Sequence, residues 1–211
     1  MANYMIPNLK EERQLFRKGY GFIAGIDEAG RGPLAGPVVV GIVVFEEKNL
    51  KKWLKFNIRD SKKLSERQRK EALKMIKKEA IEVNFSRVSE RVIDKINIRQ
   101  ATLLAMRRAF LRLKTPIDFI LIDGKDTLKN LPVNQKAIIG GDEKTMIVAA
   151  ASIVAKESRD NIMRRYAKKY LKYGFESHKG YGTKMHFEMI KKYGSCKIHR
   201  KSFHPIKDIK N

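Results

Sequence analysis

The chain has 211 residues, enough to bury a hydrophobic core as one domain or as one domain with an appendage, but few for two full-sized domains. Lysine and arginine total 46 against 23 aspartates and glutamates, and the formal net charge of +23 favours a polyanionic partner. The 43% hydrophobic content argues against a disordered basic tail, and the lone Cys196 excludes an internal disulfide. No apolar run approaches the length of a membrane span and no secretory signal pattern is present, so we expect a cytoplasmic protein with no membrane partner.

The first half of the chain is predicted to alternate strands and helices. Apolar runs rich in Ile and Val predict strands at residues 20–27, 37–45, 81–88 and 118–123, the last of them buried. Ser65 and Gln68 form a capping-box pattern before a helix that reaches residue 80. A pair of helices is expected at residues 89–96 and 97–113.

The second half is predicted to be mainly helical. A short apolar pair at residues 138–139 leads to two glycines and then to a long helix at residues 144–170, whose basic part from residue 159 is expected to be exposed. A glycine-hinged loop, a last helix at residues 183–193 and a basic irregular tail follow. This order of elements predicts an α/β or α+β sheet domain with a small helical appendage from residue 174 onward.

Four acids border glycine or end a strand-like run: Asp27, Glu28, Asp123 and Asp142. Each alone reads as a turn or capping acid, but acids at the border of a core are disfavoured unless they are paired or bound to cations. Together they predict a carboxylate cluster for Mg²⁺ or Mn²⁺, two of which can activate water and stabilise the departing oxygen of a phosphodiester. Because neighbours in a strand point to opposite faces, Asp27 and Glu28 can share one site only if the strand ends or bulges there.

Other chemistries have weaker support. The histidines have neither zinc-finger spacing nor cysteine company, so structural or phosphate-facing roles are expected for them. The absence of a Walker A pattern argues against ATP hydrolysis by that route. The element Gly30-Arg31-Gly32 is either a turn with an exposed arginine or a tight loop whose backbone can approach a sugar closely.

Seven motifs follow one another along the chain: GIDEAGRGPLAGPVV, RDSKKLSERQR, ILIDG, GGD, AAASIVAKESRD, HKGYGT and HRKSF. In this order, over roughly residues 23–203, they resemble the type 2 ribonucleases H, in particular the bacterial ribonucleases HII. The resemblance implies an α/β, ribonuclease H-like mixed sheet flanked by helices, with a catalytic domain at residues 1–173 and a small C-terminal helical region, residues 174–211, lining the substrate groove. It also implies metal-dependent endonucleolytic cleavage of the RNA strand in RNA/DNA hybrids, and cleavage 5′ of single ribonucleotides embedded in duplex DNA.

Matched residue by residue, the resemblance assigns roles to ten side chains or glycines. Those that would hold two Mn²⁺ or Mg²⁺ ions are Asp27, Glu28, Asp123 and Asp142. Those that would sense the ribose 2′-hydroxyl are Gly30, Arg31, Gly32 and Tyr181, and those that would face phosphates are Lys62 and Lys156. The related type 3 enzymes usually have a lysine where Arg31 stands, which favours the type 2 assignment.

Three functions are compatible with these residues. The first is this ribonuclease, working as a monomer on RNA/DNA hybrids and ribonucleotide-containing duplexes. The second is a non-catalytic nucleic-acid-binding protein whose acids are vestigial, and the presence of all four acids speaks against it. The third is another two-metal nuclease, such as a proofreading-type exonuclease, against which the glycine-arginine-glycine element and Tyr181 both count. The sequence assigns neither the preferred ion nor a partner such as a replication clamp.

Overall fold

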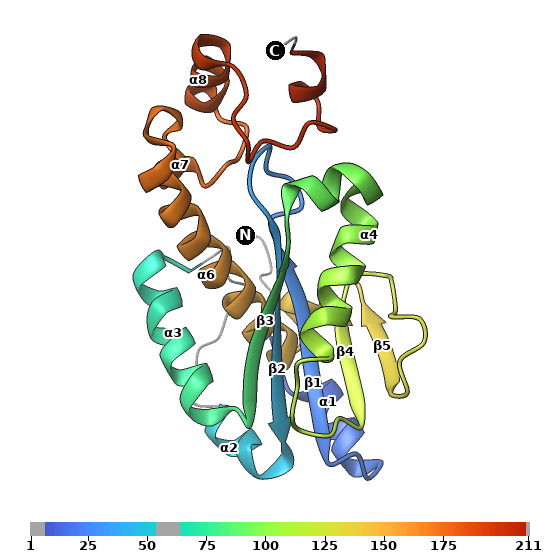
Figure 1. Ribbon diagram of the computed structural model, residues 1–211. Helices are drawn as coiled ribbons and strands as arrows, with labels where there is room; N and C mark the ends of the chain where they lie inside the picture. Colours follow the sequence, from blue (N-terminus) through green and yellow to red (C-terminus); the bar gives the residue numbers. More distant parts are fainter. Residues whose placement is uncertain (1–6, 54–63, 210–211) are drawn as a thin grey trace, which may run out of the picture.

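The computed structural model describes residues 7–53 and 64–209. Its centre is a five-stranded sheet in the order β3-β2-β1-β4-β5 (Figure 1). The first three strands pair antiparallel, whereas β1 runs parallel to β4 and β4 runs parallel to β5. The strands are β1 (Phe22–Ala29), β2 (Val38–Glu46), β3 (Glu82–Val88), β4 (Phe119–Asp123) and β5 (Asn134–Ile138).

Helices cover both faces of this sheet (Figure 1). The long helix α6 packs on β1 and β2 and has α3 beside it, while α4 packs on the opposite face against β2 and β3. Side chains alternate between the two cores, as in any strand: Ile23 of β1 faces α6 and Ala24 faces α4. The helices are α1 (Lys10–Arg17), α2 (Leu50–Trp53), α3 (Glu66–Glu79), α4 (Glu90–Phe110), α5 (Gly141–Lys144), α6 (Met146–Lys169), α7 (Phe175–His178) and α8 (Lys184–Tyr193).

The mixed sheet with flanking helices confirms the predicted α/β fold class. The capping box is present, since the Ser65 hydroxyl accepts the Gln68 N–H and the Gln68 side chain accepts the Ser65 N–H. The two helices predicted around residue 97 form one helical run, α4, that is broken by non-helical backbone at Asn97 (φ 64°, ψ 167°). Three short 3₁₀ turns complete the described chain: Glu47–Asn49, Leu171–Tyr173 and Ile206–Asp208.

Several elements differ from the expectations, among them the short helices α2 and α7, which were not predicted. Helix α1 and strand β5 were not predicted, and β5 lacks a strong apolar pattern because it is an edge strand whose Asn134 and Lys136 are exposed. The prediction that the basic part of α6 is exposed is wrong for Arg159, Asp160 and Met163, which are buried. In Arg159, Nε and Nη2 donate to the carbonyl oxygens of Pro37 and Ala35, while the buried Nη1 has no hydrogen-bond partner among the described residues.

The C-terminal residues pack against the sheet domain through two apolar clusters. In one, Met163 of α6 and Ala35 meet Tyr173, Phe175 and Ile198, and in the other Leu34 meets Ile190 and Ile206. The division into residues 1–173 and 174–211 stays a prediction. Within the described part of the chain, no helix is long and apolar enough to cross a membrane.

Candidate active site

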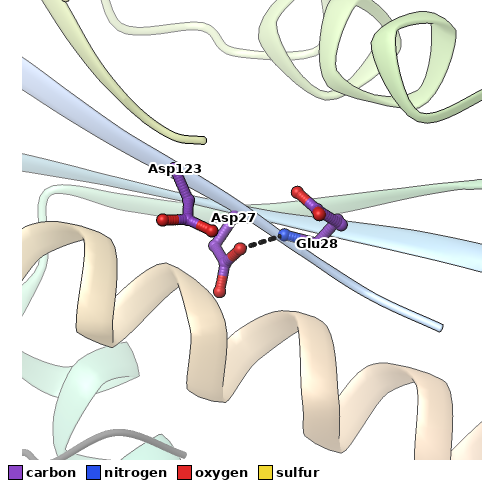
Figure 2. A group of neighbouring side chains, drawn as sticks. All are labelled: Asp27, Glu28 and Asp123. Atoms are coloured by element: carbon purple, nitrogen blue, oxygen red, sulfur yellow. Dashed lines mark hydrogen bonds between the residues drawn. The ribbon is translucent and has the colours of Figure 1, made fainter. Parts of the chain in front are cut away.

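Three of the four predicted acids meet at one edge of the sheet (Figure 2). Asp27 and Glu28 lie near the carboxyl end of β1, and Asp123 is the last residue of β4. Parallel neighbouring strands bring their carboxyl ends to the same edge, where open α/β sheets commonly bind ligands. One carboxylate oxygen from each of the three residues lies within 4.8 Å of those from the other two.

No bulge is present at the acid pair, but β1 ends at Ala29, one residue after Glu28, which agrees with the expectation that the strand ends there. Asp27 and Glu28 pair in regular register with Gly41 and Val40 of β2, and the pairing continues to Ala29. The pairing of β1 with β4 stops at Ile26, which frees the other edge of β1. Figure 2 shows Asp27 pointing towards the helix below and Glu28 leaving the opposite face of the strand. Both side chains reach the site because they flank an open strand edge.

Asp27 is the most buried of the three clustered acids. It is 4% exposed, and burial raises the pKa of its carboxyl well above the usual range. The charges of Glu28, Asp123 and Asp142 raise this pKa further, while a hydrogen bond from Ser152 lowers it. Clustered, buried carboxylates repel one another unless a cation neutralises them. This set of hard oxygen donors therefore fits Mg²⁺ or Mn²⁺.

Asp142 lies beside this group on α5 and is also buried. Gly141, the residue before Asp142, connects Asp142 to the site, because the Gly141 N–H donates to Asp123 Oδ1 at 2.7 Å. The turn into α5 uses Gly140 in the left-handed region (φ 66°). Asp142 thus acts on Asp27 by its charge, while the group within 4.8 Å consists of the other three acids.

The loop after β1 fits its surroundings only with glycine at its first position. Gly30 has φ +95°, and a Cβ there would lie 2.1 Å from Nε of Arg159 and 2.9 Å from the carbonyl oxygen of Pro37. Arg31 is half-exposed and its Nη1 lies 3.2 Å from Oε1 of Glu28. Around Gly32, a Cβ would meet no atom within 4 Å. The loop therefore contacts the acid cluster directly through Arg31.

Two fully buried arginines hold this loop, and the sequence reasoning missed both. Arg200 donates to the carbonyl oxygens of Gly30 (2.5 Å), Arg31 (2.8 Å) and Gly36 (3.0 Å). Arg159 donates to those of Ala35 and Pro37, each at 3.1 Å. Burial lowers the pKa of Arg200 to about 9. Both residues stand in quoted motifs, ESRD and HRKSF, but a motif does not reveal that a charged side chain points into the core.

Tyr181 and Lys156 lie together beside Arg159, one of the two arginines that hold that loop. Tyr181 is 43% exposed, and the centroid of its ring lies 6.0 Å from Nζ of Lys156 and 5.7 Å from Cζ of Arg159. Lys156 also pairs with Asp160 at 2.8 Å. The Leu34 N–H donates to the Gly180 carbonyl at 2.8 Å and so joins the two loops. Lys62 lies outside the described residues.

A pocket of about 570 Å³ opens beside the acids and contains Glu28, Arg31 and Asp123 in its wall. Its far side includes Arg99, which forms two hydrogen bonds to Asp126 at 2.6 and 3.0 Å. The sequence analysis assigned no role to Arg99 or Asp126 on this far side of the pocket. The remaining lining residues are Thr102, Leu103, Met106, Gly124, Lys125 and Ile139.

Known proteins share both the sequence and the fold. Residues 24–206 match the family described as Ribonuclease HII. Ribonuclease HII of Endomicrobium trichonymphae is 50% identical over 198 residues, covering 94% of this chain and 92% of that protein. Ribonuclease HII of Caldicellulosiruptor bescii is 49% identical over 192 residues, 91% of each chain.

Among solved structures, the ribonuclease H2 of Pyrococcus horikoshii OT3 superposes with a TM-score of 0.74 at 28% identity, covering 89% of this chain and 96% of that one. The same mixed sheet and flanking helices are therefore found in a protein named as a ribonuclease H2. Sequence and fold together show that the chain belongs to the ribonuclease HII family, whose members are divalent-metal-dependent endoribonucleases acting on RNA/DNA hybrids.

Proposed function

We propose that this protein hydrolyses the RNA strand of RNA/DNA hybrids and also cuts on the 5′ side of single ribonucleotides embedded in duplex DNA, using two Mg²⁺ or Mn²⁺ ions. The observation that carries the proposal is the meeting of three carboxylates within 4.8 Å beside a loop held by buried arginines. The excess of lysine and arginine suits a polyanionic substrate.

The acids Asp27, Glu28, Asp123 and Asp142 would hold the ions. When bound, such ions neutralise the scissile phosphate and supply an activated water. The protein orients its own ligands through hydrogen bonds: the Glu28 N–H donates to Asp27 at 2.6 Å and the Gly141 N–H donates to Asp123. Carboxylates held in this way need little rearrangement when a cation arrives.

We assign recognition of the sugar to the loop formed by Gly30, Arg31 and Gly32, together with Tyr181. Because Arg200 already engages the carbonyls of Gly30 and Arg31, the N–H groups of the loop are the groups that we assign to the 2′-hydroxyl. This hydroxyl is both a donor and an acceptor and distinguishes RNA from DNA. A deoxyribose would leave those groups unpaired, which is a large penalty. Phosphate contacts are assigned to Lys156 and Lys62.

The test is cleavage of a labelled duplex that carries one ribonucleotide, compared with the all-DNA duplex and with a long hybrid. We expect a cut 5′ of the ribonucleotide with either ion, none with chelator, and none in the all-DNA duplex. Cutting at other positions, or equal cutting of the all-DNA duplex, would contradict the proposal. A protein that binds the duplex without cutting it under either ion would support the non-catalytic alternative.

A further inference from the structure

Three histidines of the C-terminal region form a buried stack beside Tyr181. His178, His186 and His199 are at most 8% exposed. The rings of His178 and His186 stack at 4.3 Å between centroids with an angle of 18°, and His199 lies 5.2 Å from His186. The Phe175 ring contacts all three. We call these three residues the histidine cluster.

Backbone N–H groups determine which nitrogen of each ring carries the proton. The Cys196 N–H donates to Nδ1 of His199 at 2.8 Å, and the Gly180 N–H donates to Nδ1 of His178 at 3.1 Å. An N–H group can only donate, so both Nδ1 atoms are acceptors and each neutral ring carries its proton on Nε2. The Nε2–H of His178 then donates to the Tyr173 carbonyl at 2.7 Å.

The tautomer of His186 follows from those of the other two rings. His199 Nε2 lies 3.0 Å from His186 Nε2, so the His199 proton is donated and the His186 Nε2 accepts. His186 therefore carries its proton on Nδ1, which lies 2.9 Å from the Tyr181 carbonyl oxygen. A single set of neutral tautomers satisfies every ring nitrogen in the histidine cluster.

Two observations agree with neutral rings. Burial lowers the pKa of His186 and of His199 to about 4, and a proton added to either acceptor nitrogen would face another N–H. A metal role does not fit, since the nitrogens of His178 are both engaged by backbone groups and a structural zinc site needs four ligands.

We propose that the histidine cluster positions Tyr181 for its contact with the sugar, an inference that rests on the proposed function. His178 holds the Gly180 N–H and His186 holds the Tyr181 carbonyl, so hydrogen bonds bracket this dipeptide on both sides. The segment needs such support because Lys179, which is not a glycine, has a positive φ of 51°. The exposed Tyr181 ring thereby stays over Lys156 and Arg159.

The tautomers can be measured directly on the full-length protein. With ¹⁵N-labelled histidine near neutral pH, long-range ¹H–¹⁵N spectra should show His186 protonated at Nδ1 and His178 and His199 protonated at Nε2. His204, which is exposed and pairs with Asp208, is assigned through His204→Gln. A His186 proton on Nε2, or a charged ring in the histidine cluster, would overturn the inference.

Cleavage kinetics then test whether His186 positions Tyr181. Asn at position 186 can place an amide N–H near the position of Nδ1, whereas Leu cannot, so we compare His186→Asn with His186→Leu and use His204→Leu as the matched control. On the single-ribonucleotide duplex, His186→Leu should lower kcat by up to about a hundredfold while Kd stays unchanged, because no cation is lost. His186→Asn should restore most of that loss. Thermal unfolding of each variant shows whether it folds. If His186→Leu does not fold, the measured tautomers and the kcat of His186→Asn test the positioning role.

A double variant separates this inference from the proposed function. If His186 acts through Tyr181, adding His186→Leu to Tyr181→Ala should change kcat by no more than about twofold. Additive losses, or equal losses in His186→Leu and His186→Asn, would reduce the histidine cluster to a structural role and overturn the inference alone. No effect of Tyr181→Ala in a folded protein would overturn the assignment of Tyr181, and with it this inference.

Discussion

At Gly30 the chain leaves the acid-bearing strand in a conformation that other residues rarely adopt. Its φ is +95°, and the space where a side chain would begin is filled by Nε of Arg159 and by the Pro37 carbonyl. The same guanidinium lies under the Tyr181 ring. The absence of a Cβ at Gly30 thus lets the loop that follows β1, a buried arginine and Tyr181 pack together beside the acids.

We expect Gly30→Ala to lower the free energy of unfolding by roughly 1–3 kcal/mol, because it adds both backbone strain and a clash. Urea denaturation measures this change. The matched control is Gly32→Ala, whose Cβ would meet nothing within 4 Å and which should change stability by no more than about 0.5 kcal/mol. Equal losses in the two variants would show that packing around Gly30 is not the reason for glycine there.

At the scale of elements, the site depends on how strand and helix ends meet. Strand β1 loses its β4 neighbour at Ile26, so the next two residues face an open edge where Asp123 ends β4. The start of α5 lies against Asp123 through the Gly141 N–H. Three element ends therefore supply the acids, and charge repulsion among them opposes folding in the absence of a cation.

We expect Asp27→Asn to abolish cleavage while the metal-free protein remains folded and at least as stable as the wild type, because the change removes a buried charge. Added Mn²⁺ should raise the Tm of the wild type, since a ligand that binds only the folded state stabilises it, and should do so less for Asp27→Asn. Asp123→Asn should behave in the same way. Near wild-type turnover in either variant would contradict the two-metal proposal.

Glu12 joins α1 to the first turn of α6. Its Oε1 accepts the Ile147 N–H at 2.9 Å, while Oε2 is buried without a hydrogen-bond partner among the described residues. Burial raises the pKa of Glu12 to about 7, above the unfolded value of 4.5. The folded protein therefore binds this proton more tightly than the unfolded chain does. The stability contributed by Glu12 falls as the pH rises from about 4.5 to about 7.

We expect Glu12→Gln to remove this dependence, so that the variant gains on the order of 1–3 kcal/mol relative to wild type between about pH 5 and about pH 8. Urea denaturation at the two pH values measures the difference. Glu11→Gln is the control, because Glu11 forms a surface ion pair with Lys136 that contributes little. A constant difference between Glu12→Gln and wild type across this range would mean that Glu12 does not titrate there.

At the scale of the whole molecule, we expect the net charge to set the affinity for nucleic acid. The net charge of +23 favours binding to any nucleic acid, whereas selection for ribose is assigned to a few residues around Gly30 and Tyr181. Phosphate contacts release counterions, so binding should weaken steeply with salt.

We expect Lys156→Ala to reduce the slope of log K against log salt by about 0.9 on duplex DNA, the value for one phosphate contact. The same reduction is expected for Lys62→Ala. Lys136→Ala is the control, because Lys136 lies on the edge strand β5 and pairs with Glu11. Unchanged slopes in Lys156→Ala and Lys62→Ala would remove both lysines from the binding surface.

The sequence by itself determined the class of the fold, most element boundaries and three acids that meet in the structure, Asp27, Glu28 and Asp123, while their role as metal ligands stays a prediction. Apolar runs, the Ser65 capping box and acids at strand ends are local patterns, and short-range physics suffices to interpret them. Edge strand β5 was missed because its polar side chains carry no such pattern.

Only the tertiary structure decided the contacts between distant segments. It buries Arg159 and Arg200 under the loop at Gly30, brings Glu28 and Asp27 to one open strand edge, and orders the histidine cluster behind Tyr181. The sequence predicted an exposed basic part of α6 from residue 159 and gave the histidines structural or phosphate-facing roles. Burying such polar groups is favourable only when their hydrogen bonds are met. Those partners are backbone groups of other segments, and no local pattern in the sequence specifies where they lie.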